Sequence, residues 1–180
     1  MTTWNASTLI VLYQINGNTY DISPASHIEG EAETISTFFG LPNVTSNNVK
    51  TLNLTDSSLS ASDLNSLYSH NFVGAINASS INTLSGSAAD LITAYDSGGI
   101  TGLGDEAVTV NSGSASTSQA NTLAADTSGV VTATISDGDM ATLAGLTETG
   151  NAYTITITDS SVAAAALNTL DGKTSVAINA

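Results

Sequence analysis

The chain has 180 residues, of which 16 are acidic and only two are basic, so its formal net charge at pH 7 is −14. This balance argues against nucleic acids and anionic membrane surfaces as partners, because proteins bind both through lysine and arginine. The absence of cysteine excludes disulfide bonds and thiolate chemistry, and with 5% aromatic residues the core must consist mainly of Val, Ile, Leu and Ala.

The N-terminal sequence has no basic stretch followed by a long apolar run. We therefore expect synthesis in a cytoplasm without export by the general secretory route.

Residues 1–45 are predicted to form an N-terminal capping or docking module. Apolar runs at residues 7–15 and 19–22 flank Asn16-Gly17-Asn18, a pattern that predicts a β-hairpin. A helix is expected at residues 31–39, before a Gly-Leu-Pro breaker.

This module holds the large apolar side chains that a docking surface needs. Aromatic residues are typical anchors of protein interfaces. We expect these side chains to divide between capping the rest of the fold and burying against a partner: Trp4, Leu9, Val11, Tyr13, Phe38 and Phe39.

Residues 46–180 contain an internal repeat. Six runs share the pattern apolar–x–apolar–polar–small or acidic, and their last residues are spaced by 22, 34, 25, 22 and 21. Between most runs, Leu and Ala recur at helical intervals. The pattern predicts an α/β fold, a right-handed solenoid of parallel strands and helices with about 22 residues per turn. The runs are TLNLTD, VGAINA, AVTVNS, TATISD, TITITD and SVAINA.

The one long spacing predicts an insert at about residues 79–105. We expect a helix at residues 88–95 there, followed by a Gly-rich loop at residues 97–104. Part of this loop, GGITGLGDE, is similar to the Gly-Asp calcium repeats of secreted proteins. It leaves open a calcium site between Gly102 and Asp105, with an ordinary loop as the alternative.

Alternation along the runs separates a core face from an exposed face. The predicted core columns are Leu54, Ile76, Val110, Ile135, Ile157 and Ile178, and two residues earlier Leu52, Gly74, Val108, Ala133, Ile155 and Val176. The opposite face is small and polar, and its proposed recognition residues are Thr109, Asn111, Thr134, Ser136, Thr156 and Thr158. Similar threonine arrays occur in ice-binding solenoids, but solubilising an exposed strand is the ordinary role of such residues. Asp56, Asp137 and Asp159 fall where helices should begin, so they are predicted N-caps.

Catalytic candidates are few. His27 and His70 lack metal-ligand spacing, and no G-x-S-x-G elbow accompanies the many serines. Glu29, Glu31 and Glu33 could pair as acid and base, but a solvated acidic segment explains them as well. The sequence therefore predicts no enzyme and no cofactor or metal beyond the calcium loop.

The C-terminal segment VVTATISDGDMATLAGLTETGNAYTITITDSSVAAAALNTLDGKTSVAINA resembles repeats of very long cyanobacterial surface proteins and of structural proteins of the phages that infect them. The resemblance is weaker over residues 49–106 and absent over the first 45. It implies a non-enzymatic rod on a cell or virion surface. With five or six turns, the chain is more similar to a short decoration or knob protein of a cyanophage head than to a giant surface protein.

Two functional interpretations are open. In the first, the chain is a virion protein docked on the major capsid protein or another virion protein through residues 1–45. In the second, it is a secreted or cell-surface adhesin that binds glycans or surfaces through its Thr/Asn face. An enzyme, the third class, would need a pocket holding His27 or His70 beside carboxylates. The last strand, from Ser175 to Ala180, is expected to have an unpaired edge that either self-associates or frays.

Overall fold

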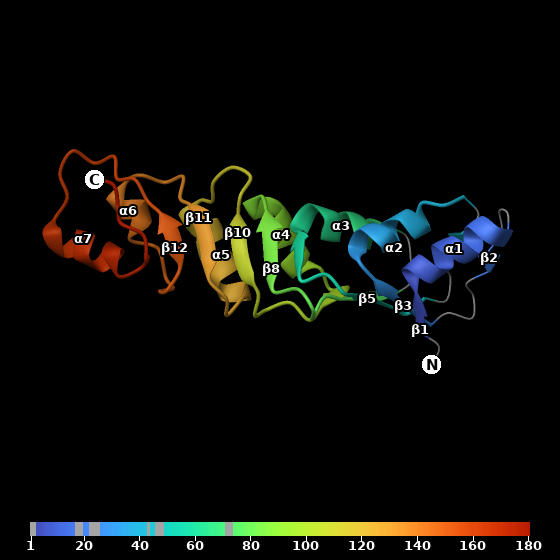
Figure 1. Cartoon of the computed structure of the whole chain (residues 1–180). Coiled ribbons are helices and arrows are strands. Elements are labelled where there is room, and N and C mark those ends of the chain that lie inside the picture. The colour runs from blue at the N-terminus through green and yellow to red at the C-terminus, as the bar shows by residue number, and fades with distance from the viewer. Residues whose placement is uncertain (1–2, 17–19, 22–25, 43, 46–48, 71–73) are drawn as a thin grey trace. The chain divides into compact units, whose positions relative to one another are not determined.

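The computed structural model describes residues 3–16, 20–21, 26–42, 44–45, 49–70 and 74–180 (Figure 1). The chain divides into two compact units. The first unit comprises Met1–Ile81 with Asp96–Leu103, and the second comprises Asn82–Tyr95 with Gly104–Ala180.

The first unit is built on a parallel sheet whose strands follow one another in chain order. Its order is β1 (Thr3–Asn5), β3 (His27–Gly30), β5 (Thr51–Leu54), β7 (Ala75–Asn77) and β9 (Ile100–Thr101). Residues opposite each other are 24 apart: Thr3 faces His27, which faces Thr51, which faces Ala75. Each strand is therefore paired one full repeat away along the chain.

Helices α1 (Ala6–Asn16), α2 (Ala32–Phe39) and α3 (Ala61–Ser69) connect these strands, and α2 packs against both α1 and α3 (Figure 1). Parallel strands need a crossover connection, and here each helix supplies one and packs its apolar face against the core. Their buried side chains include Leu9, Ile35, Phe38, Leu64 and Leu67. Strand β6 (Ser58–Ser60) precedes α3, and the short strands β2 (Tyr20–Asp21) and β4 (Val44–Thr45) pair in parallel.

The second unit repeats the design with β8 (Thr83–Gly86), β10 (Ala107–Val110), β11 (Val131–Thr134) and β12 (Ala152–Thr154), which pair in parallel in chain order. Facing residues are 24 apart between β8 and β10, 23 apart between β10 and β11, and 20 apart between β11 and β12. Its helices are α4 (Ala88–Asp96), α5 (Thr117–Asp126), α6 (Met140–Leu143) and α7 (Ala164–Asp171).

The predicted α/β class with parallel strands is confirmed, as are the helices expected at residues 31–39 and 88–95, which are α2 and α4. The predicted core columns are buried as well, apart from three half-buried positions, Gly74, Val176 and Ile178.

The predicted N-terminal hairpin is wrong, because residues 7–15 lie within helix α1. The amide of Ser7 donates to the Asn5 side chain (3.0 Å), which begins the helix directly after β1. A helix is needed here because β1 pairs in parallel with β3, and parallel neighbours cannot be joined by a hairpin. The expected Asn-Gly turn lies partly outside the described residues. The first 45 residues supply β1 and β3 to the same sheet as β5.

Residues 79–105, expected to interrupt the repeat, contain β8, α4 and β9. The spacing of 34 arises because VGAINA includes β7 of one sheet and AVTVNS includes β10 of the other. The pairing register also differs from the sequence alignment of the runs, since Leu52 faces Ile76 instead of Gly74.

Candidate docking surface and other candidate sites

The six expected docking side chains fall into three groups. Leu9, Tyr13 and Phe38 are buried, Trp4 and Phe39 are half-buried, and Val11 is 52% exposed. The rings of Phe38 and Phe39 also contact each other, with centroids 5.6 Å apart. Half of the apolar set therefore belongs to the core of the first unit, and the other half is partly or largely exposed.

Trp4 occupies the first position of a core column that runs across the sheet. It faces Ile28, and the column continues through Leu52 and Ile76, all three fully buried. Beside Trp4 lies a hollow of about 250 Å³ between β1 and α1. It is lined by Thr3, Trp4, Asn5, Thr8, Leu9 and Leu12.

Helix α1 is apolar on more than its buried side. Its residues 9–13 read LIVLY, and the chain contains no charged residue before Asp21. Four described residues of α1 are exposed, the polar Ser7, Thr8 and Gln14 and the apolar Val11, which is 52% exposed, so the outer face of the helix is uncharged and carries one large apolar side chain. The Tyr13 hydroxyl donates to the Pro42 carbonyl (3.1 Å) and ties the helix to the chain beyond α2. We call the surface formed by β1, α1 and their hollow the N-terminal surface.

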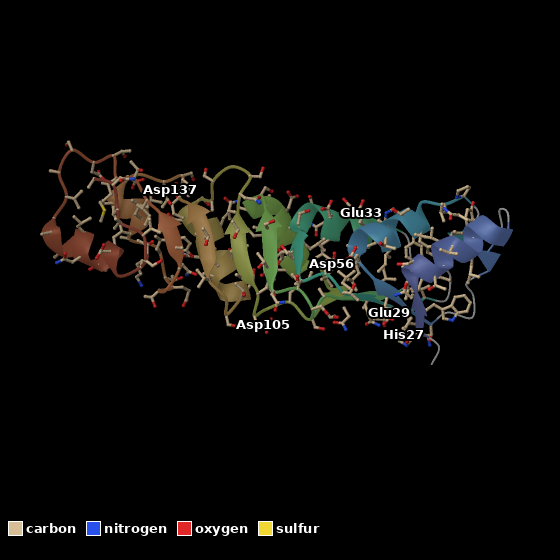
Figure 2. All side chains as sticks on the ribbon, in the orientation of Figure 1. His27, Glu29, Glu33, Asp56, Asp105 and Asp137 are labelled. Atoms are coloured by element: carbon tan, nitrogen blue, oxygen red, sulfur yellow. The ribbon has the colours of Figure 1, made fainter. Side chains whose placement is uncertain are left out.

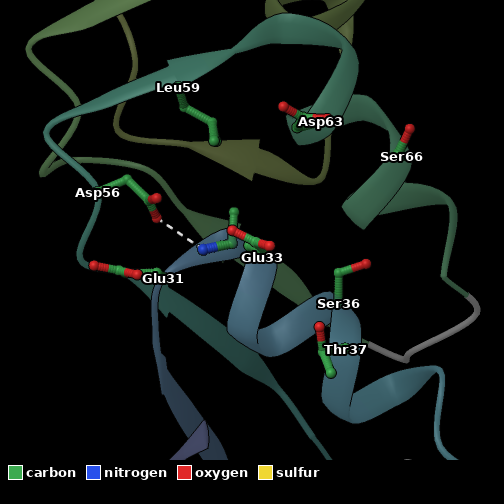
Figure 3. A pocket seen from close by; sticks show the side chains of 9 residues that line it. Glu31, Glu33, Ser36, Thr37, Asp56, Leu59, Asp63 and Ser66 are labelled. Carbon is green, nitrogen blue, oxygen red and sulfur yellow. Dashed lines mark hydrogen bonds between the residues drawn. The ribbon is translucent and has the colours of Figure 1, made fainter. Parts of the chain in front are cut away.

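An acidic cavity of about 430 Å³ lies between α2 and α3 (Figure 3). Its carboxylates are already engaged in part: Asp56 accepts from the Ala32 amide (2.9 Å), and Asp63 accepts from the Ser60 hydroxyl (2.6 Å). The cavity is lined by Glu31, Ala32, Glu33, Ser36, Thr37, Asp56, Leu59, Asp63 and Ser66. Of the three glutamates singled out in the sequence, only Glu29 is not part of this lining, because it lies on strand β3 (Figure 2).

The two histidines are separated. His27 is half-buried on β3, facing Thr3 and Thr51. The His70 Nε2 lies 3.2 Å from the Ser36 hydroxyl at the rim of the acidic cavity. A catalytic triad would need a third group on the other ring nitrogen of His70, and no carboxylate among the described residues hydrogen-bonds it.

Sequence reasoning missed a buried carboxylate in the second unit. Glu106 is 1% exposed, and its side chain accepts the Tyr95 hydroxyl and the amides of Gly104 (2.9 Å) and Asp105 (3.3 Å). Burial and this carboxylate both raise the pKa of Tyr95. Glu106 could have been found from its phase, because it precedes the buried Val108 by two residues and so shares its inward face.

The backbone of the suggested calcium loop binds a carboxylate of the chain itself. Two of its amides, Gly104 and Asp105, point at Glu106, and Gly102 adopts a φ of +82° that favours glycine. Within the described ranges, no group of three or more His, Asp or Glu side chains is placed to hold a metal ion.

The three aspartates predicted as N-caps do cap helices, but of the preceding repeat. The Asp56, Asp137 and Asp159 carboxylates accept from the amides of Ala32 (2.9 Å), Thr117 (2.6 Å) and Met140 (2.7 Å), which lie 24, 20 and 19 residues earlier. The local caps come from other residues: Ser60 for α3, Ser116 for α5 and Asp139 for α6. The hydrogen bond to the Thr142 amide lowers the pKa of Asp139. The N-termini of α2, α5 and α6 therefore each accept a cap from an aspartate of the next repeat.

The proposed recognition face is open to solvent for the most part. Asn111, Thr134, Ser136, Thr156 and Thr158 are exposed, and Thr109 is half-buried. Its members do not form one column, because Thr134 faces Thr154, whereas Thr156 faces Asn179.

The C-terminal segment pairs with the repeat before it. The Ile157 backbone amide donates to the Asn179 backbone carbonyl (2.7 Å), and the Asn179 backbone amide donates to the Ile155 carbonyl (3.0 Å). Beside it, the Lys173 ammonium donates to the Thr147 carbonyl (2.7 Å), near a hollow of about 250 Å³ lined in part by Leu143 and Leu170.

No protein-family model matches the chain, and no curated protein or solved structure is significantly similar to it. None of the helices within the described ranges has the length and apolar character that crossing a membrane requires.

Proposed function

We propose that this protein is a non-enzymatic structural protein whose repeats stack as a right-handed α/β solenoid. The support is the register of the parallel strands, in which facing residues recur 24 apart through the first unit and 20–24 apart through the second. The cross-repeat aspartate caps support it too, since a repeat whose helix is completed by its neighbour is stable mainly within a stack.

We further propose that the chain decorates the head of a tailed cyanophage and docks there through its N-terminal surface. The observation that carries this proposal is helix α1, which is uncharged and leaves Val11 exposed in a chain with a net charge of −14. An uncharged face with an exposed valine can approach a partner without burying unpaired charge, whereas the acidic remainder would stay in solvent. The resemblance to phage structural repeats suggests the capsid as that partner.

Co-sedimentation with undecorated cyanophage heads tests the proposal. Deleting residues 1–45 would remove β1 and β3 and uncover β5, so a point variant is the cleaner probe. Val11→Asp should abolish pelleting, because it places a charge in the interface. Val130→Asp is the matched control: this valine is 48% exposed and lies in the second unit. If wild type stays in the supernatant, the virion proposal fails; if wild type and both variants pellet equally well, docking through the N-terminal surface fails.

A second candidate function, adhesion, is favoured by the exposed Thr134 and its facing neighbour Thr154, which place two hydroxyls side by side on the strand face. Cell binding should then fall with Thr134→Lys and survive Val11→Asp. Catalysis would be revealed by turnover that disappears in His70→Ala. Self-association through the segment from Ser175 to Ala180 stays a prediction, which sedimentation velocity tests.

A further inference from the structure

The edge of β1 presents backbone groups to an additional strand. In the same sheet, the Ala75 amide donates to the Lys50 carbonyl of the preceding repeat (3.0 Å), whereas the Ile76 amide donates to the Gly99 carbonyl of the following repeat (2.8 Å). Amides thus alternate between the two neighbours, as in any parallel sheet. One repeat unit is 24 residues, an even number, so the alternation carries over to β1. Thr3 therefore directs its amide and carbonyl away from β3, Asn5 directs its amide away from β3, and Trp4 directs its backbone groups toward β3. The Asn5 carbonyl is engaged, because it accepts the first hydrogen bond of α1.

The core column is also open at this edge. Ile28, Leu52 and Ile76 are each fully buried, whereas Trp4, in the same column, is half-buried and borders the 250 Å³ hollow. The hollow is large enough for one aliphatic side chain. A strand placed beside β1 would direct every second side chain into this space, since side chains alternate along a strand.

Charge indicates what kind of strand fits. No charged residue occurs before Asp21, so the lining of the hollow offers no ion pair to a charged side chain that enters it. A basic or acidic segment would lose hydration there without compensation. The chemistry that matches is an uncharged, extended segment with alternating apolar residues.

We infer that β1 accepts a parallel strand from another protein, and that an apolar side chain of this strand fills the hollow beside Trp4. This inference rests on the proposed docking function and specifies its mode, β-strand addition in place of helix-face packing. Affinity comes from backbone hydrogen bonds to Thr3 and Asn5, and selectivity comes from the residue that enters the hollow.

Four variants of the full chain separate the backbone contribution from the hollow. Thr3→Pro removes one outward amide at the exposed first residue of an edge strand, where proline is tolerated, and Thr3→Ala is its control. Thr8→Trp fills the hollow from an exposed position of α1, and Ser7→Trp adds the same side chain at an exposed position outside the lining. Because Thr8→Trp changes no core residue, it keeps the test valid even if Thr3→Pro disturbs the fold.

The probe is a library of short random peptides displayed on phage and selected on the wild-type chain. The enriched peptides should be uncharged with alternating apolar residues. Their affinity should fall roughly tenfold with Thr3→Pro and with Thr8→Trp, and stay unchanged with the two controls. The inference is overturned if no peptide is enriched, if the enriched peptides are charged, or if neither variant weakens them. It is also overturned if wild type sediments as a dimer that Thr8→Trp dissociates, because the occupant is then a second copy.

The same variants with cyanophage heads distinguish this inference from the proposed function. If wild type pellets and only Val11→Asp prevents it, docking stands and strand addition is overturned. If wild type does not pellet but the selected peptides bind as expected, the virion role fails and strand addition stands.

Discussion

Replacing Asp137 by alanine should loosen the helix of the preceding repeat, not the helix that follows Asp137 in the chain. The Asp137 carboxylate accepts from the Thr117 amide at 2.6 Å, at the N-terminus of α5. The capping box between Ser116 and Gln119 satisfies other groups at this end and leaves the Thr117 amide to Asp137.

The expected cost follows from the geometry. Loss of a charged acceptor from a helix N-terminus costs about 1–2 kcal/mol, and water can replace part of the bond because Asp137 is half-buried. For a chain of this size, about 1.5 kcal/mol corresponds to a fall of about 3–6 °C in Tm. Asp137→Asn keeps an acceptor and loses only the charge, so it should cost about 0.5 kcal/mol.

Hydrogen–deuterium exchange locates the effect. In Asp137→Ala the Thr117 amide should exchange roughly tenfold faster, as a loss of about 1.4 kcal/mol implies, while the Thr142 amide keeps its rate. Asp139→Ala is the reciprocal control, because Asp139 caps α6 through Thr142 (2.9 Å) and should accelerate that amide alone. If Asp137→Ala accelerates Thr142 and spares Thr117, the cap is local and the reasoning from neighbouring repeats is wrong.

Three further outcomes are expected. Tyr95→Phe should lower the free energy of unfolding by about 2 kcal/mol in urea titrations, because the buried Glu106 loses a hydroxyl donor. Tyr68→Phe, at a tyrosine that is 42% exposed, should be near neutral, and equal effects of the two variants would contradict the hydrogen bond from Tyr95 to Glu106. Burial, with a smaller contribution from the charge of Glu148, raises the pKa of Tyr153 from 10.0 to about 12. The contribution of Tyr153 to the free energy of unfolding is therefore complete below pH 10 and is lost as the pH rises through about 12. Tyr153→Phe should lose stability less steeply at alkaline pH than wild type, and an equal dependence of stability on pH would refute this. Gly129→Ala should lower the free energy of unfolding by about 2 kcal/mol or more, because the added Cβ would overlap the Glu106 carbonyl. Gly98→Ala places its Cβ in open space and should leave Tm within about a degree of wild type. If Gly129→Ala is tolerated, the backbone there can shift.

The amino-acid sequence alone determined the local features of this protein. Alternation predicted the inward side chains of the strands, as at Val108 and Ile155, because side-chain direction along a strand depends only on position. Leu and Ala at helical intervals between the runs located α3, α5, α6 and α7, because the inward face of a helix also depends only on position along the chain. Parallel strands followed from the length of the segments between the runs.

Only the tertiary structure decided which residues meet across repeats. Residues 7–15 combine strand-like composition with a nearby turn signal, yet they form α1 because β1 pairs in parallel with β3. The role of Asp137 depends on Thr117, 20 residues earlier, and the burial of Glu106 depends on Tyr95. Such partners come from the pairing register, and the register is set by the packing of whole repeats, which local sequence periodicity does not encode.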